Sequence, residues 1–322
     1  MDKVVALLQS DMDGVEARFQ ENLSSDVPLI NQVGEYVLSS GGKRIRPMLL
    51  LLAARLCEYR GKDHIELAGV VEFIHTATLL HDDVVDDAEL RRGNRSANTV
   101  WGNQTSVLVG DFLFAKTFSL MVACGNLEVL RLLSDTTTRM AEGEVQQLLN
   151  TGDLDVDEER YLKVIRSKTA ILIAAACEVG AVLAESSEEK VKALREFGLE
   201  IGTAFQLMDD ALDYVAEQED FGKAKGHDLA EGKMTLPLIH AYAHADAQQR
   251  QEVSRIVLED ELSDPDLIYV CELIAATNGI KYTRQKAVER VAAAKLYLQI
   301  FPDCSARSAL FDLADYVVAR NM

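Results

Sequence analysis

Apolar residues recur at spacings of three and four along nearly the whole chain, which is the spacing of one face of an α-helix. No stretch alternates strictly between apolar and polar residues, so no β-strand is required. Cutting the chain where glycine, proline and serine interrupt the pattern predicts about a dozen helices, several of them near or above 20 residues. The interruptions are Pro28, Gly41-Gly42, Gly61, Gly102, Gly125, Gly152, Ser186-Ser187, residues 222–226, Pro265, Asn278-Gly279 and Pro302. The pattern therefore predicts an all-α protein.

Two of the predicted helices, residues 65–80 and 168–183, are apolar around most of their circumference. Such helices are buried on all sides, so we expect them at the centre of a bundle with the other helices around them. The 322 residues contain no linker, no low-complexity segment and no repeat of fixed period. We therefore predict one helical domain over residues 1–322.

Composition and charge narrow the class of protein. Hydrophobic residues make up 48% and charged residues 26%, as in ordinary soluble proteins. The net charge of −19 disfavours binding to nucleic acid or to anionic membranes. The five cysteines lack paired spacing, which indicates reduced, structural thiols. Residues 1–9 lack the features of a signal peptide, and the apolar runs 47–57 and 170–184 are shorter than a membrane span. We expect a cytoplasmic protein without a transmembrane segment.

An acidic motif, Asp82-Asp83-Val-Val-Asp86, ends the first of the two apolar helices. Asp82 and Asp86 are four residues apart, so their Cβ atoms lie on one helix face about 5–6 Å apart. Carboxylates this close repel one another unless a cation lies between them, and acids at a helix C-terminus oppose the helix dipole. Taken alone, the motif is explained equally well by a solvated helix end.

A second acidic motif, Asp209-Asp210-Ala-Leu-Asp213, repeats this spacing on another apolar helix. Two copies embedded in hydrophobic sequence are hard to explain as surface, because burying unpaired acids is costly. Carboxylate oxygens favour Mg²⁺, which is usually shared with the phosphates of a substrate. If the two helices face one another, they form a carboxylate-lined mouth on the bundle.

Basic clusters accompany the acidic motifs. Residues 41–47 place Lys43 and Arg46 beside Pro47, a residue suited to the first position of a helix, whose backbone amides attract anions. Arg91 and Arg92 follow the first acidic motif, and arginine binds phosphate in bidentate fashion. Further candidates are Lys168-Thr169 at the start of an apolar helix and the lysines Lys223 and Lys233 after the second acidic motif.

This combination predicts two diphosphates bound side by side. One would be held by Lys43, Arg46 and Arg92, and the other through Mg²⁺ by the two acidic motifs. A metal-bound diphosphate is a good leaving group, because the cations stabilise the charge that develops on it. No Ser/His/Asp triad and no reactive cysteine is evident, which fits ionisation of an allylic diphosphate and capture of the carbocation by a second molecule's double bond. Apolar helices would hold the hydrocarbon and exclude water.

The chain closely resembles the trans-isoprenyl diphosphate synthases, and among them the bacterial long-chain polyprenyl (octaprenyl-type) synthases. The resemblance covers roughly residues 25–320, and the matching motifs occur in family order. These motifs are residues 41–47, 73–86, 91–93, 110–111, 143–148, 168–169, 206–213 and 232–237. The resemblance implies an all-α bundle around a deep central cavity, usually a homodimer, whose long-chain products become quinone side chains.

The resemblance also implies a role for each matching residue. The isopentenyl diphosphate site comprises Lys43, Arg46, His75 and Arg92. The allylic diphosphate site comprises Arg91, Lys168, Thr169, Gln206 and Lys223. Asp82, Asp86 and Asp209 are the implied direct Mg²⁺ ligands, with Asp83, Asp210 and Asp213 nearby in the metal shell. These six aspartates and Lys168 are the candidate catalytic residues. Three Mg²⁺ ions are expected with substrate bound, and Mn²⁺ can substitute.

The helix that ends at Asp82 bears on product length. Thr78, Ala77, Ile74 and Val71 lie 4, 5, 8 and 11 residues before Asp82, along the expected path of the hydrocarbon. The absence of an aromatic residue at 77 or 78 predicts a long product from farnesyl diphosphate. The family resemblance favours octaprenyl diphosphate as the product, with heptaprenyl, nonaprenyl or geranylgeranyl diphosphate as alternatives. Phe118, Leu120 and Met121 are candidates for the cavity floor.

Two departures from the family pattern, His227 and Met234, lie in the loop expected to close over the allylic diphosphate, and they put binding of the third metal ion in doubt. Three other functions explain fewer of these features. A metal phosphohydrolase using His75 and His81-Asp82 leaves residues 41–47 and the second acidic motif unexplained. A terpene cyclase lacks the basic cluster for a second diphosphate. A non-catalytic regulatory subunit typically loses the acidic motifs, which are intact here.

Overall fold

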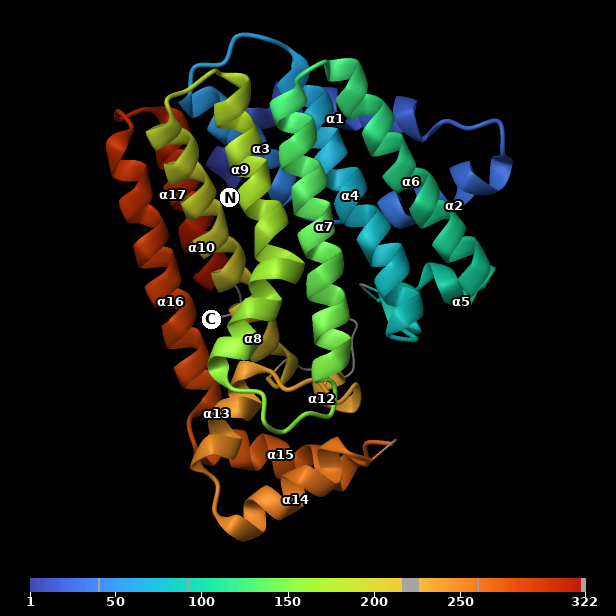
Figure 1. The fold of residues 1–322 in the computed structure, drawn as a ribbon, viewed down its shortest axis with the longest axis vertical. Helices are drawn as coiled ribbons and strands as arrows, with labels where there is room; N and C mark the ends of the chain where they lie inside the picture. Colours follow the sequence, from blue (N-terminus) through green and yellow to red (C-terminus); the bar gives the residue numbers. More distant parts are fainter. Residues whose placement is uncertain (40, 92, 216–225, 260, 320–322) are drawn as a thin grey trace. The chain divides into compact units, whose positions relative to one another are not determined.

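The computed structural model is built almost entirely of helices, as the apolar spacing predicts (Figure 1). It describes residues 1–39, 41–91, 93–215, 226–259 and 261–319. These residues form two compact units, each described here by itself. Unit 1 comprises residues 1–137, 172–198 and 297–313, and unit 2 comprises residues 138–171, 199–296 and 314–322. The single-domain organisation stays a prediction.

Unit 1 is built around the apolar helix that carries the first acidic motif. Its helices are α1 (Asp2–Leu23), α2 (Pro28–Ser39), α3 (Ile45–Leu56), α4 (Asp63–Val85), α5 (Ala97–Trp101) and α6 (Asn103–Cys124), joined by parts of α7 (Leu127–Asn150), α9 (Ile171–Leu183), α10 (Glu188–Asp213) and α17 (Ser305–Ala319) and by the 3₁₀-turn η2 (Leu298–Ile300). Helix α4 packs against α1, α3, α5 and α6, and α4 runs beside α6 in Figure 1. The prediction that residues 65–80 lie at the centre is therefore confirmed within this unit.

The core of unit 1 packs closely around the part of α4 that precedes its acidic end. Phe73, Ala77 and Leu80 of α4 pack with Val109 and Leu113 of α6 and with residues of α1 and α2. The rings of Phe19 and Phe73 stack with their centroids 4.0 Å apart. Side chains in such a core occupy fixed rotamers. The last turn of α4, which carries Asp82 and is capped by Asp86, therefore extends from a well-packed base.

Unit 2 contains the second acidic motif. Its remaining elements are α8 (Glu158–Ile165), the π-turn η1 (Arg166–Ala170), α12 (His227–Ala230), α13 (Leu236–His244), α14 (Ala247–Val257), α15 (Asp264–Ala276) and most of α16 (Gly279–Tyr297). Helix α13 packs against α8, α14 and α15. Pro28 begins α2, Gly279 begins α16, and Pro265 lies in the first turn of α15, as the interruptions in the sequence predict.

Two local features differ from the sequence prediction. A short antiparallel hairpin, β1 (Leu90–Arg91) and β2 (Asn94–Arg95), follows α4, although no strand was expected. Gly93 has a φ of 79°. That left-handed conformation is easy for glycine and permits the tight turn. Helix α3 begins at Ile45, so Pro47 is the third helical residue and not the first. Proline is still accepted there, because the first N–H groups of a helix have no partner within it.

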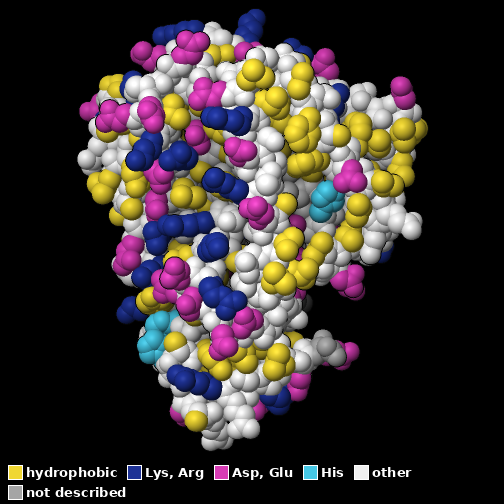
Figure 2. Space-filling model, viewed as in Figure 1, with side chains coloured by type: hydrophobic (Ala, Val, Ile, Leu, Met, Phe, Trp, Pro, Cys, Tyr) yellow, Lys and Arg dark blue, Asp and Glu magenta, His cyan; other side chains and the backbone are white. Residues whose placement is uncertain are grey.

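Helix α6 bears on the expectation that the chain has no transmembrane segment, which stays a prediction. Among the described residues, α6 is the one helix long and apolar enough to cross a membrane, by length and composition alone. Only 28% of its most apolar 18-residue stretch is buried inside the protein. Leu108 and Val122 are 67% and 64% exposed, and Figure 2 shows hydrophobic side chains gathered over α6. The helix therefore has an exposed apolar face within unit 1.

Candidate active site

The first acidic motif lies on the last turn of α4. Asp82 and Asp86 are both partly exposed, and the backbone N–H of Asp86 donates to the carbonyl of Asp82 at 2.8 Å, which closes the final helical turn. Their i, i+4 relation places both carboxylates on one helix face, as predicted. Hard oxygen donors on a rigid helix end fit Mg²⁺.

The side chain of Asp83 is oriented differently from those of Asp82 and Asp86. Its side chain is buried, and its Oδ1 accepts a hydrogen bond from Nε of Arg91 at 2.5 Å. Its backbone carbonyl accepts a hydrogen bond from the side-chain amide of Asn98 at 3.0 Å. A buried carboxylate paired with arginine contributes to local order. Asp83 thus fixes the β1 strand, and with it Arg91, against the end of α4.

The basic loop before α3 is held by a contact that the sequence analysis missed. Arg44 has a φ of 48°, and its Nη1 donates to Oε1 of the buried Glu72 on α4 at 2.5 Å. Lys43, its neighbour, is exposed, and Arg46 is half-buried. The strained αL conformation at a non-glycine residue could not be inferred from the residue type. The Arg44–Glu72 pair ties the predicted isopentenyl diphosphate residues of unit 1 to α4.

The residues predicted to control product length have unequal exposure. Val71, Ile74 and Ala77 are completely buried in α4, whereas Thr78 and His75 are partly exposed. The Thr78 hydroxyl donates to the carbonyl of His75 at 2.8 Å. On α6, Met121 is buried, Leu120 is partly buried and Phe118 is 37% exposed. A role for each of them in product length stays a prediction.

The second acidic motif, like the first, has two partly exposed aspartates and one buried aspartate. Asp209 and Asp213 are partly exposed, and Asp210 is buried. Oδ2 of Asp210 accepts a hydrogen bond from the Tyr161 hydroxyl at 2.5 Å, and Oδ1 accepts one from the Gln206 side chain at 2.8 Å. Burial raises the pKa of Asp210 well above its usual value, and the nearby Asp228 adds to the rise. Burial likewise raises the pKa of Tyr161, so this hydroxyl remains a donor.

Hydrogen bonds extend this network to the predicted allylic site. The Thr169 hydroxyl donates to Oε1 of Gln206 at 3.0 Å, so Thr169, Gln206, Asp210 and Tyr161 form one chain of contacts. Nζ of Lys168 lies 2.8 Å from the Glu144 carboxylate on α7. A cavity of about 110 Å³ joins Lys168, Thr169, Gln206 and Asp210 with Asp228 and Lys233. Sequence reasoning assigned no role to Glu144, although it lies in the matching motif 143–148, and it missed Tyr161, which belongs to no recognised motif.

The two departures from the family pattern lie near this cavity. Nε2 of His227 is 3.2 Å from the Glu231 carboxylate, which also pairs with Nζ of Lys233 at 2.5 Å. Met234 is buried and lines the cavity. The backbone N–H of Asp228 donates to Oδ2 of Asp213 at 3.1 Å. Asp228, at the start of α12, is thus anchored to the second acidic motif.

Two predicted site residues, Arg92 and Lys223, lie outside the described residues. Among the described residues, no three His, Cys, Asp or Glu side chains are grouped closely enough to hold a metal by themselves. The donor chemistry still fits Mg²⁺, because the two carboxylates of each motif that share a helix face are the partly exposed ones. Magnesium commonly takes one or two carboxylates together with substrate phosphates.

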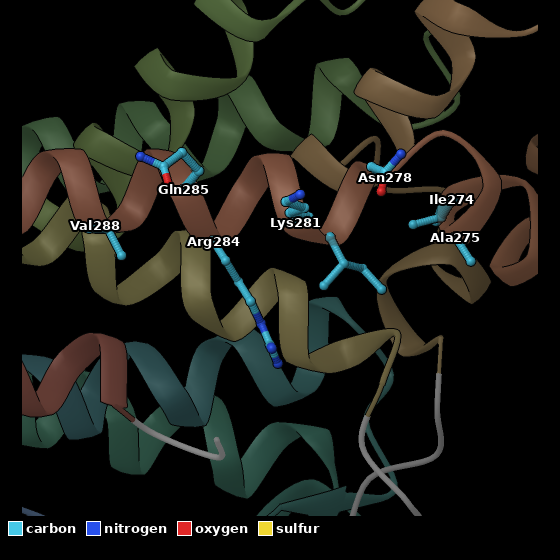
Figure 3. A pocket seen from close by; sticks show the side chains of 8 residues that line it. Ile274, Ala275, Asn278, Lys281, Arg284, Gln285 and Val288 are labelled. Carbon is cyan, nitrogen blue, oxygen red and sulfur yellow. The ribbon is translucent and has the colours of Figure 1, made fainter.

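A larger groove of about 420 Å³ lies between the end of α15 and α16 (Figure 3). Lys281 and Arg284 of α16 line it together with Ile274 and Ala275 of α15. None of the residues predicted to act in the site lines this groove. The residues predicted to act in the site instead include those that line the smaller cavity and those at the acidic end of α4.

Comparison with known proteins defines the class. The all-α architecture is that of the isoprenoid synthases. A crystal structure of a polyprenyl synthase from Caulobacter crescentus, complexed with calcium and isoprenyl diphosphate, superimposes on this chain with a TM-score of 0.97. The two sequences are 43% identical, and the match covers 100% of this chain and 98% of that one. A decaprenyl diphosphate synthase from Rhodobacter capsulatus gives a TM-score of 0.95 at 44% identity, covering 99% and 98%.

Sequence comparison then gives the family. Residues 27–274 match the profile of the Polyprenyl synthetase family. The chain is 47% identical over 321 residues to octaprenyl diphosphate synthase of Escherichia coli K12, which covers 100% of this chain and 99% of that protein. The chain belongs to the polyprenyl synthetase family, a family of prenyltransferases.

Proposed function

We propose that this enzyme elongates an allylic diphosphate with successive isopentenyl diphosphate units to a long-chain all-trans polyprenyl diphosphate, with octaprenyl diphosphate as the favoured product and quinone side chains as its use. The observation that carries the proposal is the full-length 47% identity to an octaprenyl diphosphate synthase together with two intact acidic motifs. Incubation with Mg²⁺, farnesyl diphosphate and labelled isopentenyl diphosphate, followed by product sizing, tests it. Absence of elongation would refute it.

The proposed roles follow the site residues. Lys43, Arg46, His75 and Arg92 bind isopentenyl diphosphate, while Arg91, Lys168, Thr169, Gln206 and Lys223 bind the allylic diphosphate. Asp82, Asp86 and Asp209 are the proposed Mg²⁺ ligands, in a site of three ions with substrate bound. When bound, Mg²⁺ stabilises the negative charge that develops on the leaving diphosphate. Buried Asp83 and Asp210 hold Arg91 and Gln206 in place, and the apolar helices exclude water from the carbocation.

The two diphosphate sites should separate kinetically. We expect Arg46→Ala to raise KM for isopentenyl diphosphate about tenfold or more, with a smaller effect on the allylic substrate, because uniform binding to one ligand is lost. Lys168→Ala should do the reverse, since Lys168 lines the cavity with Thr169 and Gln206. Steady-state kinetics with each substrate varied in turn measure both values. Equal effects of both changes on both substrates would show that the assignment is wrong.

The exposed face of α6 supports a homodimer, which the family resemblance implies. Val107, Leu108, Phe118 and Val122 are all at least 36% exposed, a concentration of apolar surface typical of an interaction site. We expect the double change Leu108→Glu and Val122→Glu to convert a species of twice the chain mass into a monomer in sedimentation analysis. Ile268→Glu on α15, where the side chain is 57% exposed, is the control and should leave the mass unchanged. A wild-type monomer would contradict the proposal.

We place the enzyme in the cytoplasm.

A further inference from the structure

The π-turn η1, between α8 and α9, carries Lys168 and Thr169. π-turns are rare and occur mostly as single turns within α-helices, frequently at functional sites. The amino acids at positions 166–170 do not by themselves account for the π-helical turn, because the same residues could form a regular α-helix. Contacts with neighbouring elements of unit 2 must therefore hold the turn.

Two glycines allow α7 and α10 to approach the backbone of the turn closely. A Cβ atom at Gly143 of α7 would lie 2.8 Å from the backbone N of Lys168. A Cβ atom at Gly202 of α10 would lie 2.5 Å from Cα of Ala170. Both distances are shorter than any side chain tolerates, so the turn fits against two bare stretches of helix. This close fit restrains the turn on two sides.

Glu200 supplies the polar contact on the α10 side, two residues before Gly202. Glu200 is buried, with only 8% of its surface exposed. Its Oε1 accepts a hydrogen bond from Arg166, the first residue of η1, at 3.4 Å, and its Oε2 accepts one from Arg290 of α16 at 3.2 Å. One carboxylate thus joins the π-turn, α10 and α16. No family motif identified in the sequence contains it.

Removing this carboxylate would leave two guanidinium groups without their shared anion. The side chains of Arg166 and Arg290 are 37% and 29% exposed, so solvent compensates for the loss only in part. Breaking a largely buried ion pair from one side is much more costly than the net contribution of the pair. The cheapest response is displacement of Arg166, which is covalently part of the turn that carries Lys168 and Thr169.

We propose that Glu200 is a positioning residue for the allylic diphosphate: through Arg166 it holds the π-turn so that Lys168 and Thr169 line the cavity. The proposal rests on the proposed function. On α10, Gly202 and Gln206 lie one turn apart on one face and approach the last residue of the turn and Thr169, respectively. Glu200 reaches the first residue of the turn through the side chain of Arg166. Glu200 itself does not line the cavity, so its effect is indirect.

The test compares both KM values in Glu200→Gln, which keeps the side-chain volume and removes the charge. We expect KM for the allylic diphosphate to rise about tenfold and KM for isopentenyl diphosphate to change by less than about twofold. Arg290→Met keeps the Glu200–Arg166 contact and should shift the allylic KM in the same direction by a smaller factor. It carries the test if Glu200→Gln does not fold. Lys286→Met is the matched control, because it removes an ion pair between α16 and α8 at Glu158 without touching η1.

A second measurement separates positioning from a general structural role. If Glu200 acts through the π-turn, Glu200→Gln should raise the allylic KM by less than about twofold when Lys168 is already alanine. Additive effects, equal rises in both KM values, or an equal effect of Lys286→Met would overturn the proposal. Wild-type enzyme that fails to elongate any allylic primer would instead refute the proposed function. Normal wild-type elongation with an unchanged allylic KM in Glu200→Gln would refute only the positioning role.

Discussion

Asp82→Ala and Asp209→Ala should each lower kcat by at least about a hundredfold, because charge stabilisation of this kind acts mainly in the transition state. A chelator should abolish the activity of the unmodified enzyme, and Mg²⁺ or Mn²⁺ should restore it. The measurement is single-turnover and steady-state elongation, with thermal unfolding followed in parallel. Both side chains are partly exposed, so we expect little change in the free energy of unfolding.

Asp87→Asn is the control for this prediction. Asp87 belongs to the same acidic run but is exposed, and its φ of 48° is one that asparagine also adopts. The variant loses one negative charge beside the motif without losing a proposed ligand, so its kcat should stay within about threefold of the wild-type value. Full turnover in the presence of chelator, or an equal loss in Asp87→Asn, would show that the acidic motifs do not act through metal.

The helices were predictable because the apolar spacing is a local signal. Proline and glycine at Pro28, Gly102 and Gly125 end or begin helices through their own backbone preferences. The π-turn η1 was not predictable, because it depends on the approach of Gly143 and Gly202 from distant parts of the chain. The hairpin at Gly93 was missed since two-residue strands are too short to show alternation.

The site was predictable to the extent that its chemistry depends on spacing. The i, i+4 pair Asp82 and Asp86 is on one helix face as expected, and Asp83, one residue on, points about 100° away around the helix, into the interior. Its partner Arg91 could not be deduced, because that contact depends on the hairpin. Tyr161 was missed for the same reason: a single tyrosine gives no sequence signal until folding brings it to Asp210.

The exposed face of α6 illustrates a further limit of sequence patterns. Its apolar residues fit a buried helix, and only the structure reveals that Leu108 and Val122 remain exposed in unit 1. An apolar residue in a sequence indicates that its side chain is favoured away from water, but it does not indicate which part of the same chain or of another chain covers it. Core positions such as Val71 and Ile74 and interface candidates such as Leu108 therefore look alike in the sequence.

Product length is expected to respond to Ala77, which is completely buried and packs with Phe73, Leu80, Val109 and Leu113. A tyrosine introduced there must either enter the space that receives the growing hydrocarbon or overpack the core, which costs about 1–3 kcal/mol. Each helical turn of α4 spans about 5.4 Å, comparable to one isoprene unit, so a block within the first two turns before Asp82 stops growth early.

We therefore expect Ala77→Tyr to shorten the product to about farnesyl or geranylgeranyl size while the enzyme remains active, as product sizing by chromatography would show. Met121→Ala should leave the product unchanged or longer, since cutting back a floor residue deepens a cavity. Ala17→Tyr, at an exposed position of α1, is the control and should leave the product at full length. If Ala77→Tyr does not fold, Thr78→Phe carries the same test, because Thr78 is partly exposed and one turn before Asp82. Full-length product from a stable, active variant would mean that the hydrocarbon does not pass this face of α4.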